Sequence, residues 1–447
     1  MELKINTQHL TNDVTTLQNI ETYEDVASIF SYEERTSAWI SIKELLTTQM
    51  YDSNIRLGTG NKNDILSING FKQILSSLKH FMANVKNKEK RDLFLGASTG
   101  LLLHEQQVKD AYFPYYDNSP DNVIYMLNCG NLSELTKFKA YTKNHNVVVE
   151  NYLLVIIKKL YSRFLYKKIS KEQTKKIKNF SLTLEEYGIT VPHTLLLQQY
   201  AEFVAGYKLY RWFFSKLNIE KAYIVSAPTK SDMVAALKSL NIKTIEIQHG
   251  VVGKLHRGYN FAFQQKPLIP TVDEIHVYDQ FWKDEILHAG YFYNEQIKVV
   301  GRLKYDVVRK HIDALNFKYI IFTGQGAFLE QISDFFVSSE SYLKQNHIKI
   351  IYRPHPRELE SEKQYFKNKI KALEMSYFDY EGYTTEELIK NSYAHISIFS
   401  SCHFDAVYYN NKTYILDIMP ENIMNYYAFS APKSFIKINT MNEVANV

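Results

Sequence analysis

Residues 222–250 read AYIVSAPTKSDMVAALKSLNIKTIEIQHG, and this stretch decides the fold class. Residues 222–226 and 244–248 are short, mainly apolar runs, which predicts two β-strands. Between them, residues 231–240 place apolar side chains at helical spacing. A strand, a helix and a second strand in this order are typical of neighbouring parallel strands joined by a crossover helix. The stretch therefore favours an α/β fold.

The same alternation extends in both directions along the chain. Further strands are predicted at residues 92–96, 123–127, 274–278, 297–301, 318–323, 347–352, 376–378, 395–399 and 413–416. Further helices are predicted at residues 280–289 and 327–345, after Thr384 (where Glu387 completes a capping box) and from about His403. We expect two doubly wound, Rossmann-like domains, at residues 91–303 and 316–447.

Two helical regions complete the predicted organisation. Apolar spacing within residues 31–34, 39–46 and 71–85 predicts a mainly helical N-terminal region over residues 1–90. A second helical region, long and basic, is predicted as an insertion in the first Rossmann-like domain and reaches to about Phe214.

The composition excludes disordered, fibrous and globally basic proteins. Apolar residues make up 45% and charged residues 23% of the 447 positions, as in ordinary globular chains. The net charge is +5, but residues 158–178 contain nine Lys or Arg and only one acid, Glu172. This segment therefore carries +8 and the rest of the chain is net acidic, so we expect no nucleic-acid partner.

Targeting and cofactor signals are missing from the sequence. The N-terminus lacks the apolar segment of a secretory signal, and charged residues interrupt the most apolar stretch, residues 147–160. Cys129 and Cys402 cannot build a disulfide framework, and no zinc-ligand spacing, P-loop or Gly-x-Gly-x-x-Gly motif occurs. We expect a cytoplasmic protein without a metal or a cofactor.

The basic segment at residues 158–178 predicts a helix at a membrane surface. The apolar residues that can form one stripe between its Lys and Arg side chains are Leu153, Leu154, Ile157, Leu160, Phe164 and Leu165. Such a helix would hold the chain peripherally on the inner face of the cytoplasmic membrane, near a lipid-linked substrate. A solvated basic face is the alternative.

Four groups of polar residues follow predicted strands, where open α/β sheets bind ligands. These groups are His249-Gly250, Gly324-Gln325-Gly326, Arg353-Pro354-His355-Pro356-Arg357 and Ser400-Ser401. The arginine loop, stiffened by two prolines, suits a di-anion such as a phosphate or pyrophosphate, and a rigid surface turn is the alternative. The Gly-Gln-Gly group allows close backbone approach to a ligand, or is only a turn.

The remaining candidates also have alternative interpretations. Ser400 and Ser401 open a predicted helix, so they bind an anion there or only cap the helix. His249 is a candidate general base or phosphate partner, or else a structural histidine. Asp110 and Glu246 are rival bases, with Glu246 the weaker because it would point to the opposite face of its strand.

As a set, the motifs resemble those of bacterial surface-polysaccharide transferases of the GT-B type. The relatives concerned are capsule-polysaccharide glycosyltransferases, including users of CMP-Kdo and CMP-sialic acid, and CDP-glycerol glycerophosphotransferases. The resemblance covers residues from about 220 to 420. The motifs are Gln248-His-Gly, Val277-Tyr-Asp, Gly290, Val299-Val-Gly-Arg, Tyr352-Arg-Pro-His-Pro-Arg and Phe399-Ser-Ser-x-x-x-Asp-Ala.

This resemblance implies two Rossmann-like domains that face a cleft, with the acceptor on the first and the donor on the second. It implies that His355-Pro356 and Ser400-Ser401 hold the phosphate and cytidine end of the donor, and that Asp405 meets the ribose. It places His249-Gly250 near the reaction centre. The acidic-acidic-Gly motif of the sialyltransferases is incomplete at Tyr380-Glu-Gly, which has one acid and counts against a sialyltransferase.

The function expected from the sequence is an inverting, metal-independent GT-B glycosyltransferase. It would move a sugar from a nucleotide-activated donor, with a CMP-sugar favoured, to a glycan or lipid-linked glycan acceptor of a capsule, O-antigen or lipooligosaccharide. His249 is the predicted catalytic residue. The predicted donor-binding residues are Gly324, Gln325, Arg353, His355, Arg357, Ser400, Ser401 and Asp405. The alternatives are a CDP-alditol phosphotransferase, a UDP-sugar 2-epimerase and a non-catalytic member of an assembly complex.

Overall fold

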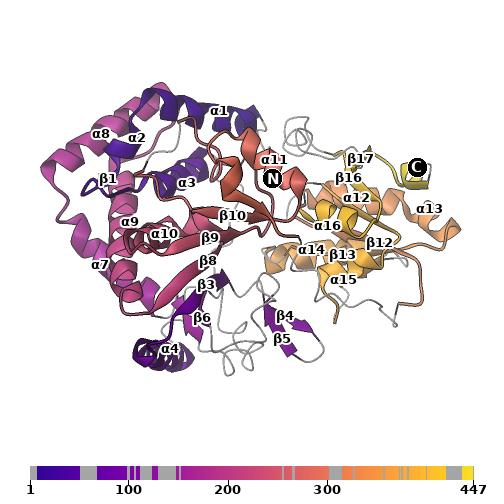
Figure 1. The fold of residues 1–447 in the computed structure, drawn as a ribbon. Helices are drawn as coiled ribbons and strands as arrows, with labels where there is room; N and C mark the ends of the chain where they lie inside the picture. The colour runs from indigo at the N-terminus through magenta and orange to yellow at the C-terminus, as the bar shows by residue number, and fades with distance from the viewer. Residues whose placement is uncertain are drawn as a thin grey trace. The chain divides into compact units, whose positions relative to one another are not determined.

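Two parallel β-sheets organise the chain in the computed structural model of the protein (Figure 1). The residues that the structure describes are 8–50, 68–97, 101–104, 107–110, 123–128, 147–150, 153–253, 256–263, 267–301, 315–325, 328–355, 358–371, 373, 376–379, 382–398, 400–418 and 435–445. The chain divides into two units, the first with Asn12–Ile55 and Gly60–Val307 and the second with Val308–Val447. The domain boundaries given above stay a prediction.

The first unit contains a seven-stranded sheet with the spatial order β11-β10-β9-β8-β3-β6-β7. All of its neighbouring strands pair in parallel. The strands are β3 (Arg91–Ala97), β6 (Val123–Asn128), β7 (Val147–Val149), β8 (Ile219–Val225), β9 (Lys243–Ile247), β10 (Glu274–Val277) and β11 (Ile297–Val299). Numbered along the chain, this is the order 3-2-1-4-5-6-7, which reverses direction between β3 and β8.

The second unit contains a six-stranded parallel sheet with the order β14-β13-β12-β15-β16-β17. Its strands are β12 (Tyr319–Thr323), β13 (Lys349–Arg353), β14 (Ser376–Phe378), β15 (Ala394–Ser397), β16 (Thr413–Leu416) and β17 (Phe435–Ile438). This is the 3-2-1-4-5-6 order of a Rossmann fold, with its reversal between β12 and β15. The predicted α/β class with two doubly wound, Rossmann-like sheets is confirmed.

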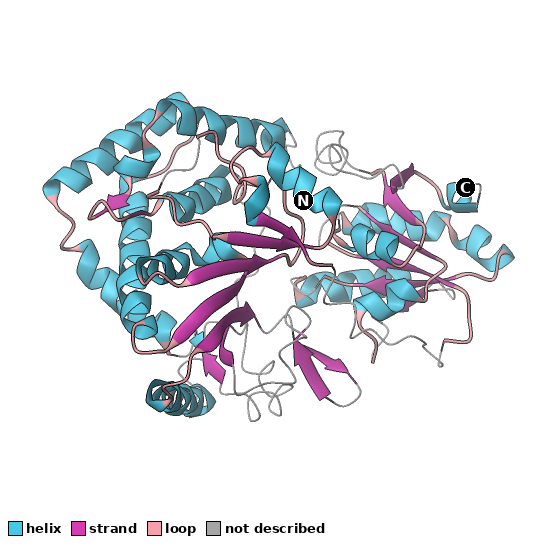
Figure 2. Cartoon of the chain, viewed as in Figure 1, coloured by secondary structure: helices cyan, strands magenta, loops and turns pink. Residues whose placement is uncertain are grey.

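Helices flank the strands of each sheet (Figure 2). Those of the first unit are α1 (Gln8–Tyr23), α2 (Val26–Ile29), α3 (Trp39–Met50), α4 (Ile68–Lys86), α7 (Leu154–Tyr166), α8 (Lys171–Glu186), α9 (His193–Phe214), α10 (Ser231–Ser239) and α11 (Gln280–His288), with short 3-10 turns η5 (Ala227–Lys230) and η6 (Asn294–Gln296). Helix α9 is the centre of this layer, because α3, α7, α8 and α10 all pack against it. Within the described residues, the predicted helical regions at the N-terminus and before Phe214 are confirmed, with one exception.

The exception is the segment at residues 31–34, which was expected to be helical. It belongs to a hairpin of β1 (Ser31–Tyr32) and β2 (Thr36–Ser37). Glu33 and Glu34 in its turn have φ angles of 50° and 54°, a left-handed conformation that a right-handed helix does not contain. A second hairpin joins β4 (Leu101–His104) and β5 (Gln107–Asp110).

The helices of the second unit follow its strands in the expected places. They are α12 (Leu329–Ser338), α13 (Glu340–Gln345), α14 (Glu360–Ile370), α15 (Thr385–Lys390), α16 (Cys402–Tyr408) and the 3-10 turn η8 (Met441–Ala445). The helix predicted over residues 327–345 is interrupted at Ser339, whose hydroxyl donates to the Phe335 carbonyl. The predicted capping box of α15 is present, since Thr384 and Glu387 exchange hydrogen bonds of 3.1 and 2.8 Å.

Candidate functional site

The carboxyl edge of the six-stranded sheet brings three of the predicted groups together. The β12, β13 and β15 strands are neighbours in this sheet, and each is followed by one candidate group. The Gly324 N–H donates to the Arg353 carbonyl at 2.8 Å, and the Ser397 hydroxyl donates to the Thr323 carbonyl at 2.6 Å. The three loops therefore start side by side at the reversal of the strand order, where doubly wound sheets bind ligands.

Gly324 is required by a close contact rather than by its backbone angles. A β-carbon at this position would lie 2.2 Å from the Tyr352 hydroxyl and 2.5 Å from Oε1 of Glu358. Neither distance is tolerable for a carbon atom. The first loop can therefore pass over the end of β13 only because residue 324 has no side chain.

A buried carboxylate, Glu358, holds the histidine of the second loop. Its Oε1 accepts a hydrogen bond from the backbone N–H of His355 at 2.7 Å, and its own N–H donates to the His355 carbonyl at 2.9 Å. The Tyr352 hydroxyl donates to the same carboxylate at 3.2 Å. Glu358 was not among the predicted site residues, although an acid three residues after an unpaired backbone N–H is a recurrent capping pattern.

The Arg353 side chain is directed at protein acceptors. It donates to Oδ1 of Asp379 at 2.6 Å, to the Tyr383 carbonyl at 2.9 Å and to the Thr385 hydroxyl at 3.3 Å. These contacts fix the connection between β14 and α15. At least three of the five N–H donors of this guanidinium are thus engaged within the unit. Arg357, the other arginine of the predicted loop, lies outside the described residues.

The Ser-Ser group splits into two different environments. Ser400 is buried, and its Oγ accepts a hydrogen bond from the Cys402 N–H at 3.2 Å, which is the capping role given above as the alternative. Ser401 is solvent-exposed at the start of α16 and its hydroxyl makes no cap bond. Asp405 is nearly buried in α16, and Gln325 is half-buried after Gly324.

Two neutral histidines lie under this edge. Thr413 Oγ1 lies 2.8 Å from Nδ1 of His395 and 2.6 Å from Nδ1 of His403. Nε2 of His395 lies 2.9 Å from the Thr323 hydroxyl. Burial lowers the pKa of His395 to about 3 and lowers that of His403 well below its usual value. Both rings are therefore uncharged at neutral pH.

The carboxyl edge of the seven-stranded sheet carries His249, directly after β9. The loop that presents it is fixed by the buried side chain of Gln248, whose Nε2 donates to the Gly250 carbonyl at 2.8 Å. Oε1 of Gln248 accepts from the Tyr278 N–H at 2.9 Å, which ties the loop to the end of β10. A β-carbon at Gly250 would meet no atom within 4 Å, so a lack of space is not the reason for glycine there.

Glu246, two residues before Gln248, is a carboxyl group whose pKa is strongly shifted. It is 1% exposed, and its Oε1 accepts hydrogen bonds from the Tyr259 hydroxyl at 2.5 Å and from the Ala227 N–H at 3.0 Å. Burial raises the pKa of Glu246 to about 7, against the opposing effects of these hydrogen bonds and of the Lys230 charge. The side chain of Asp110, the other rival base, lies outside the described part of the structure.

A cluster of charged groups that sequence reasoning did not find surrounds Lys230 on the same edge. Burial lowers the pKa of Lys230, although the charges of Glu150, Glu246 and Asp232 raise it. Lys158 donates to Oδ2 of Asp232 at 3.0 Å. Lys158 was expected on the flank of a membrane-surface stripe, but this ion pair holds it against the unit.

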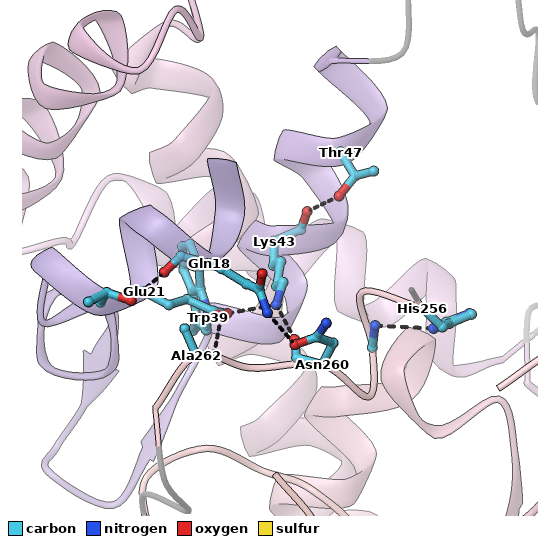
Figure 3. Close-up of polar contacts among 10 residues, drawn as sticks. Gln18, Glu21, Trp39, Lys43, Thr47, His256, Asn260 and Ala262 are labelled. Atoms are coloured by element: carbon cyan, nitrogen blue, oxygen red, sulfur yellow. Dashed lines mark hydrogen bonds and ion pairs between the residues drawn. The ribbon is translucent and has the colours of Figure 1, made fainter. Parts of the chain in front are cut away.

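The N-terminal helices brace the loop that carries Tyr259 (Figure 3). Nζ of Lys43 donates to Oε1 of Glu21 at 2.7 Å and to the Asn260 carbonyl at 2.6 Å. Glu21 also accepts hydrogen bonds from the Trp39 ring at 2.8 Å and from the Ala262 N–H at 2.8 Å. Glu21 and Lys43 are both buried, so removing either partner would leave the other side chain buried without its ion-pair partner.

The same loop contains a histidine that stays neutral. His256 accepts a hydrogen bond on Nδ1 from the Gly258 N–H at 3.1 Å. Burial, followed by the neighbouring charge of Arg257, lowers the pKa of His256 to about 4. Arg257 itself pairs with Glu44 of α3 at 3.2 Å.

Among the described residues, no helix is long and apolar enough to cross a membrane. In the same part of the chain, no three His, Cys, Asp or Glu side chains gather in a way that could hold a metal ion.

No protein-family model matches the sequence, and neither does any curated protein. Among solved structures, the fold is similar to UDP-GlcNAc 2-epimerase from Methanocaldococcus jannaschii, at 12% identity and a TM-score of 0.44, over 78% of this chain and 89% of that chain. The UDP-GlcNAc 2-epimerase from Neisseria meningitidis bound to UDP-GlcNAc is 9% identical with a TM-score of 0.45, and the match covers 79% of this chain and 87% of that chain. The glycotransferase of kitacinnamycin is 9% identical with a TM-score of 0.43, and the match covers 80% of this chain and 87% of that chain. Because these identities and TM-scores are low, the function of this chain has to be inferred from its own residues.

Proposed function

We propose that the protein is a metal-independent glycosyltransferase of the GT-B type, which moves a sugar from a nucleotide-activated donor to a bacterial surface glycan. One observation carries this proposal. The strand order of the six-stranded sheet reverses between β12 and β15, and the Gly324, His355 and Ser401 loops follow strands at that reversal. Such an edge is where doubly wound sheets bind nucleotides.

The donor phosphates are the proposed ligand of this edge. Gly324 allows close backbone approach, Gln325 offers its amide side chain, and the loop held by Glu358 presents the His355 imidazole. The exposed Ser401 hydroxyl adds a donor, and Asp405 is proposed to meet the ribose. Arg353 acts mainly on loop geometry in this proposal, because Asp379 already accepts from its guanidinium. A CMP-sugar is favoured by the motifs that resemble those of capsule-polysaccharide transferases.

His249 is proposed as the base of the transfer. The neutral imidazole would take the proton of the acceptor hydroxyl while that oxygen forms a bond to the anomeric carbon. The bond from this carbon to the donor phosphate breaks, and its electron pair leaves with the nucleotide. A single displacement of this kind inverts the anomeric centre. Gln248 would act as a positioning residue, because its side chain fixes the loop on both sides of His249.

A lipid-linked acceptor is supported by the surface of α7. Ile157, Leu160 and Phe164 are exposed along one side of this helix. The Lys168 ammonium lies 4.1 Å from the centre of the Phe164 ring. An apolar stripe with basic flanks is typical of helices that lie on anionic membranes. We therefore propose a peripheral membrane contact here, without the contribution of Lys158.

Nucleotide binding is tested first, by thermal shift with CMP, CDP, UDP and GDP. A ligand at a hundred times its Kd should add about 2.7 kcal/mol to the stability of the protein. His355→Ala should weaken binding of the cognate nucleotide at least tenfold in calorimetric titration. His288→Ala, an exposed histidine on α11, is the control and should leave affinity unchanged. Unchanged affinity of His355→Ala would remove the donor from this edge.

The reaction is tested with the nucleotide identified in this way. Glycosyl transfer to an acceptor supports the proposal, whereas phosphoalditol transfer from a CDP-alditol or turnover of a UDP-sugar without acceptor supports the two alternatives. His249→Ala should lower turnover about 10²–10⁴-fold with donor affinity nearly intact. If it keeps more than a tenth of the wild-type rate at saturating substrates, the base lies elsewhere.

A further inference from the structure

Helix α4 buries polar side chains and exposes many of its apolar ones. Between Phe71 and Lys86, the part of the helix whose side chains are described, two of the three buried side chains are polar. Oγ of Ser77 accepts a hydrogen bond from the Val149 N–H at 3.1 Å, and Oδ1 of Asn84 accepts from the Arg91 guanidinium at 2.8 Å. The third, Phe81, stacks on Phe213 of α9 with ring centres 4.4 Å apart. A surface helix normally directs its apolar stripe, not its polar residues, toward the core.

The apolar stripe of α4 points to the solvent. It consists of Phe71, Leu75, Leu78 and Met82, which are between 43% and 60% exposed. Their spacing of four, three and four residues places them along one narrow line on the helix surface. Trp212 at the end of α9 is 53% exposed, and its ring centre lies 6.2 Å from that of Phe81. An exposed tryptophan therefore lies beside α4, next to the buried Phe81.

All charged side chains of α4 are basic. The sequence of the helix, INGFKQILSSLKHFMANVK, has Lys72, Lys79 and Lys86 and no acid. These lysines are seven residues apart, so they lie on one side of the helix, beside the apolar stripe, and all three are exposed. A protein partner usually combines apolar contacts with charges of both signs. An uninterrupted basic edge beside an apolar stripe matches a surface that is negative throughout.

We propose that α4, together with Trp212, is a docking surface for an anionic lipid bilayer. In this arrangement α4 lies in the plane of the membrane, with its four apolar side chains at the acyl boundary and its lysines among the headgroups. Trp212 would take the interfacial position that tryptophan favours. This surface is distinct from α7, and the inference does not depend on the proposed reaction.

The test is co-sedimentation of the full chain with vesicles of phosphatidylglycerol and phosphatidylcholine. Leu75→Glu/Leu78→Glu should weaken partitioning at least tenfold. The matched control is Ser76→Glu/Ala83→Glu, which adds the same charge at exposed positions outside the stripe and should keep most of the binding. Trp212 gives a second measurement, because Trp39 and Trp282 are buried and only Trp212 should shift to the blue on binding. Trp212→Phe should abolish that shift.

Three results would overturn the proposal. These are a wild-type chain that does not sediment with anionic vesicles, equal binding by the stripe variant and its control, and a wild-type dimer in solution that the stripe variant separates. The last would make α4 an interface between two copies. If the stripe variant fails to fold, Lys72→Gln/Lys79→Gln/Lys86→Gln replaces it, since these exposed side chains need not affect folding. Unchanged binding of this variant to anionic vesicles also refutes the proposal.

Discussion

Replacing Glu246 by Gln should remove a pH dependence from the stability of the first unit. The pKa of this carboxyl is raised from 4.5 to about 7, so the folded chain keeps a proton that the unfolded chain releases between these values. Stability from this group is therefore fully present below pH 4.5 and is lost as the pH rises to 7. The gap of roughly 2.5 pH units, at 1.36 kcal/mol for each, amounts to about 3 kcal/mol. Gln can still accept from Tyr259 and Ala227.

Urea unfolding between pH 5 and 8 measures this effect. Tryptophan fluorescence reports the first unit, because all three tryptophans, Trp39, Trp212 and Trp282, belong to it. From pH 5 to pH 8 the free energy of unfolding of the wild type should fall by about 2–3 kcal/mol relative to Glu246→Gln. Glu220 is an exposed carboxyl on the neighbouring strand, so the free energy of unfolding of Glu220→Gln should depend on pH in the same way as that of the wild type. If the Glu246→Gln profile is also parallel, the carboxyl is ionised in the folded chain at every pH tested.

Three further predictions concern stability. Lys43→Met leaves the buried carboxylate of Glu21 without its ammonium partner and should destabilise the first unit by about 3–5 kcal/mol, seen as a lower Tm, with Lys43→Arg less harmful. Gly206→Ala would place a β-carbon 1.9 Å from Oδ2 of Asp232 and should lower the free energy of unfolding by about 1–3 kcal/mol. Adding Asp232→Ala to the same chain should restore part of this stability in a double-mutant cycle. His395 has a lowered pKa, so the stability that its neutral ring contributes is lost as the pH falls below about 6.5. By pH 5 the free energy of unfolding should have fallen by about 2 kcal/mol, measured by urea unfolding followed by circular dichroism. His395→Gln should not show this decrease.

The strands of both sheets could be predicted where they are long enough to show their pattern. Buried parallel strands such as β12 and β13 read as continuous apolar runs, and the helices between them confirm the direction of the chain. Strand β7 was missed because its three valines are too few to show a strand pattern, and they were read together with the apolar start of α7 as one interrupted apolar stretch. The β1–β2 hairpin was missed because strands of two residues carry no periodic signal.

The loops of the candidate site could be predicted because parallel strands place their carboxyl ends on one edge. The charge states of the site residues could not be predicted, because they depend on which other residues cover each side chain. Glu246 was predicted to be a weak candidate base because of the strand face on which it lies. Its pKa depends instead on burial beneath the loop that carries Tyr259. Likewise, Lys158 was counted as part of a basic run, although Asp232, distant in the sequence, turns it inward.

The bond between Lys43 and Asn260 has a consequence for how the chain is made. These residues are 217 positions apart. At the usual 5–20 residues per second, the ribosome needs roughly 10–40 s to supply Asn260 after Lys43 has been added. Throughout this interval α1 and α3 have no loop to close against, and the buried ion pair of Glu21 and Lys43 lacks the loop that covers it. Newly made chains should therefore depend on a chaperone at the N-terminus, and a slow codon run before residue 260 should lower the yield of folded protein.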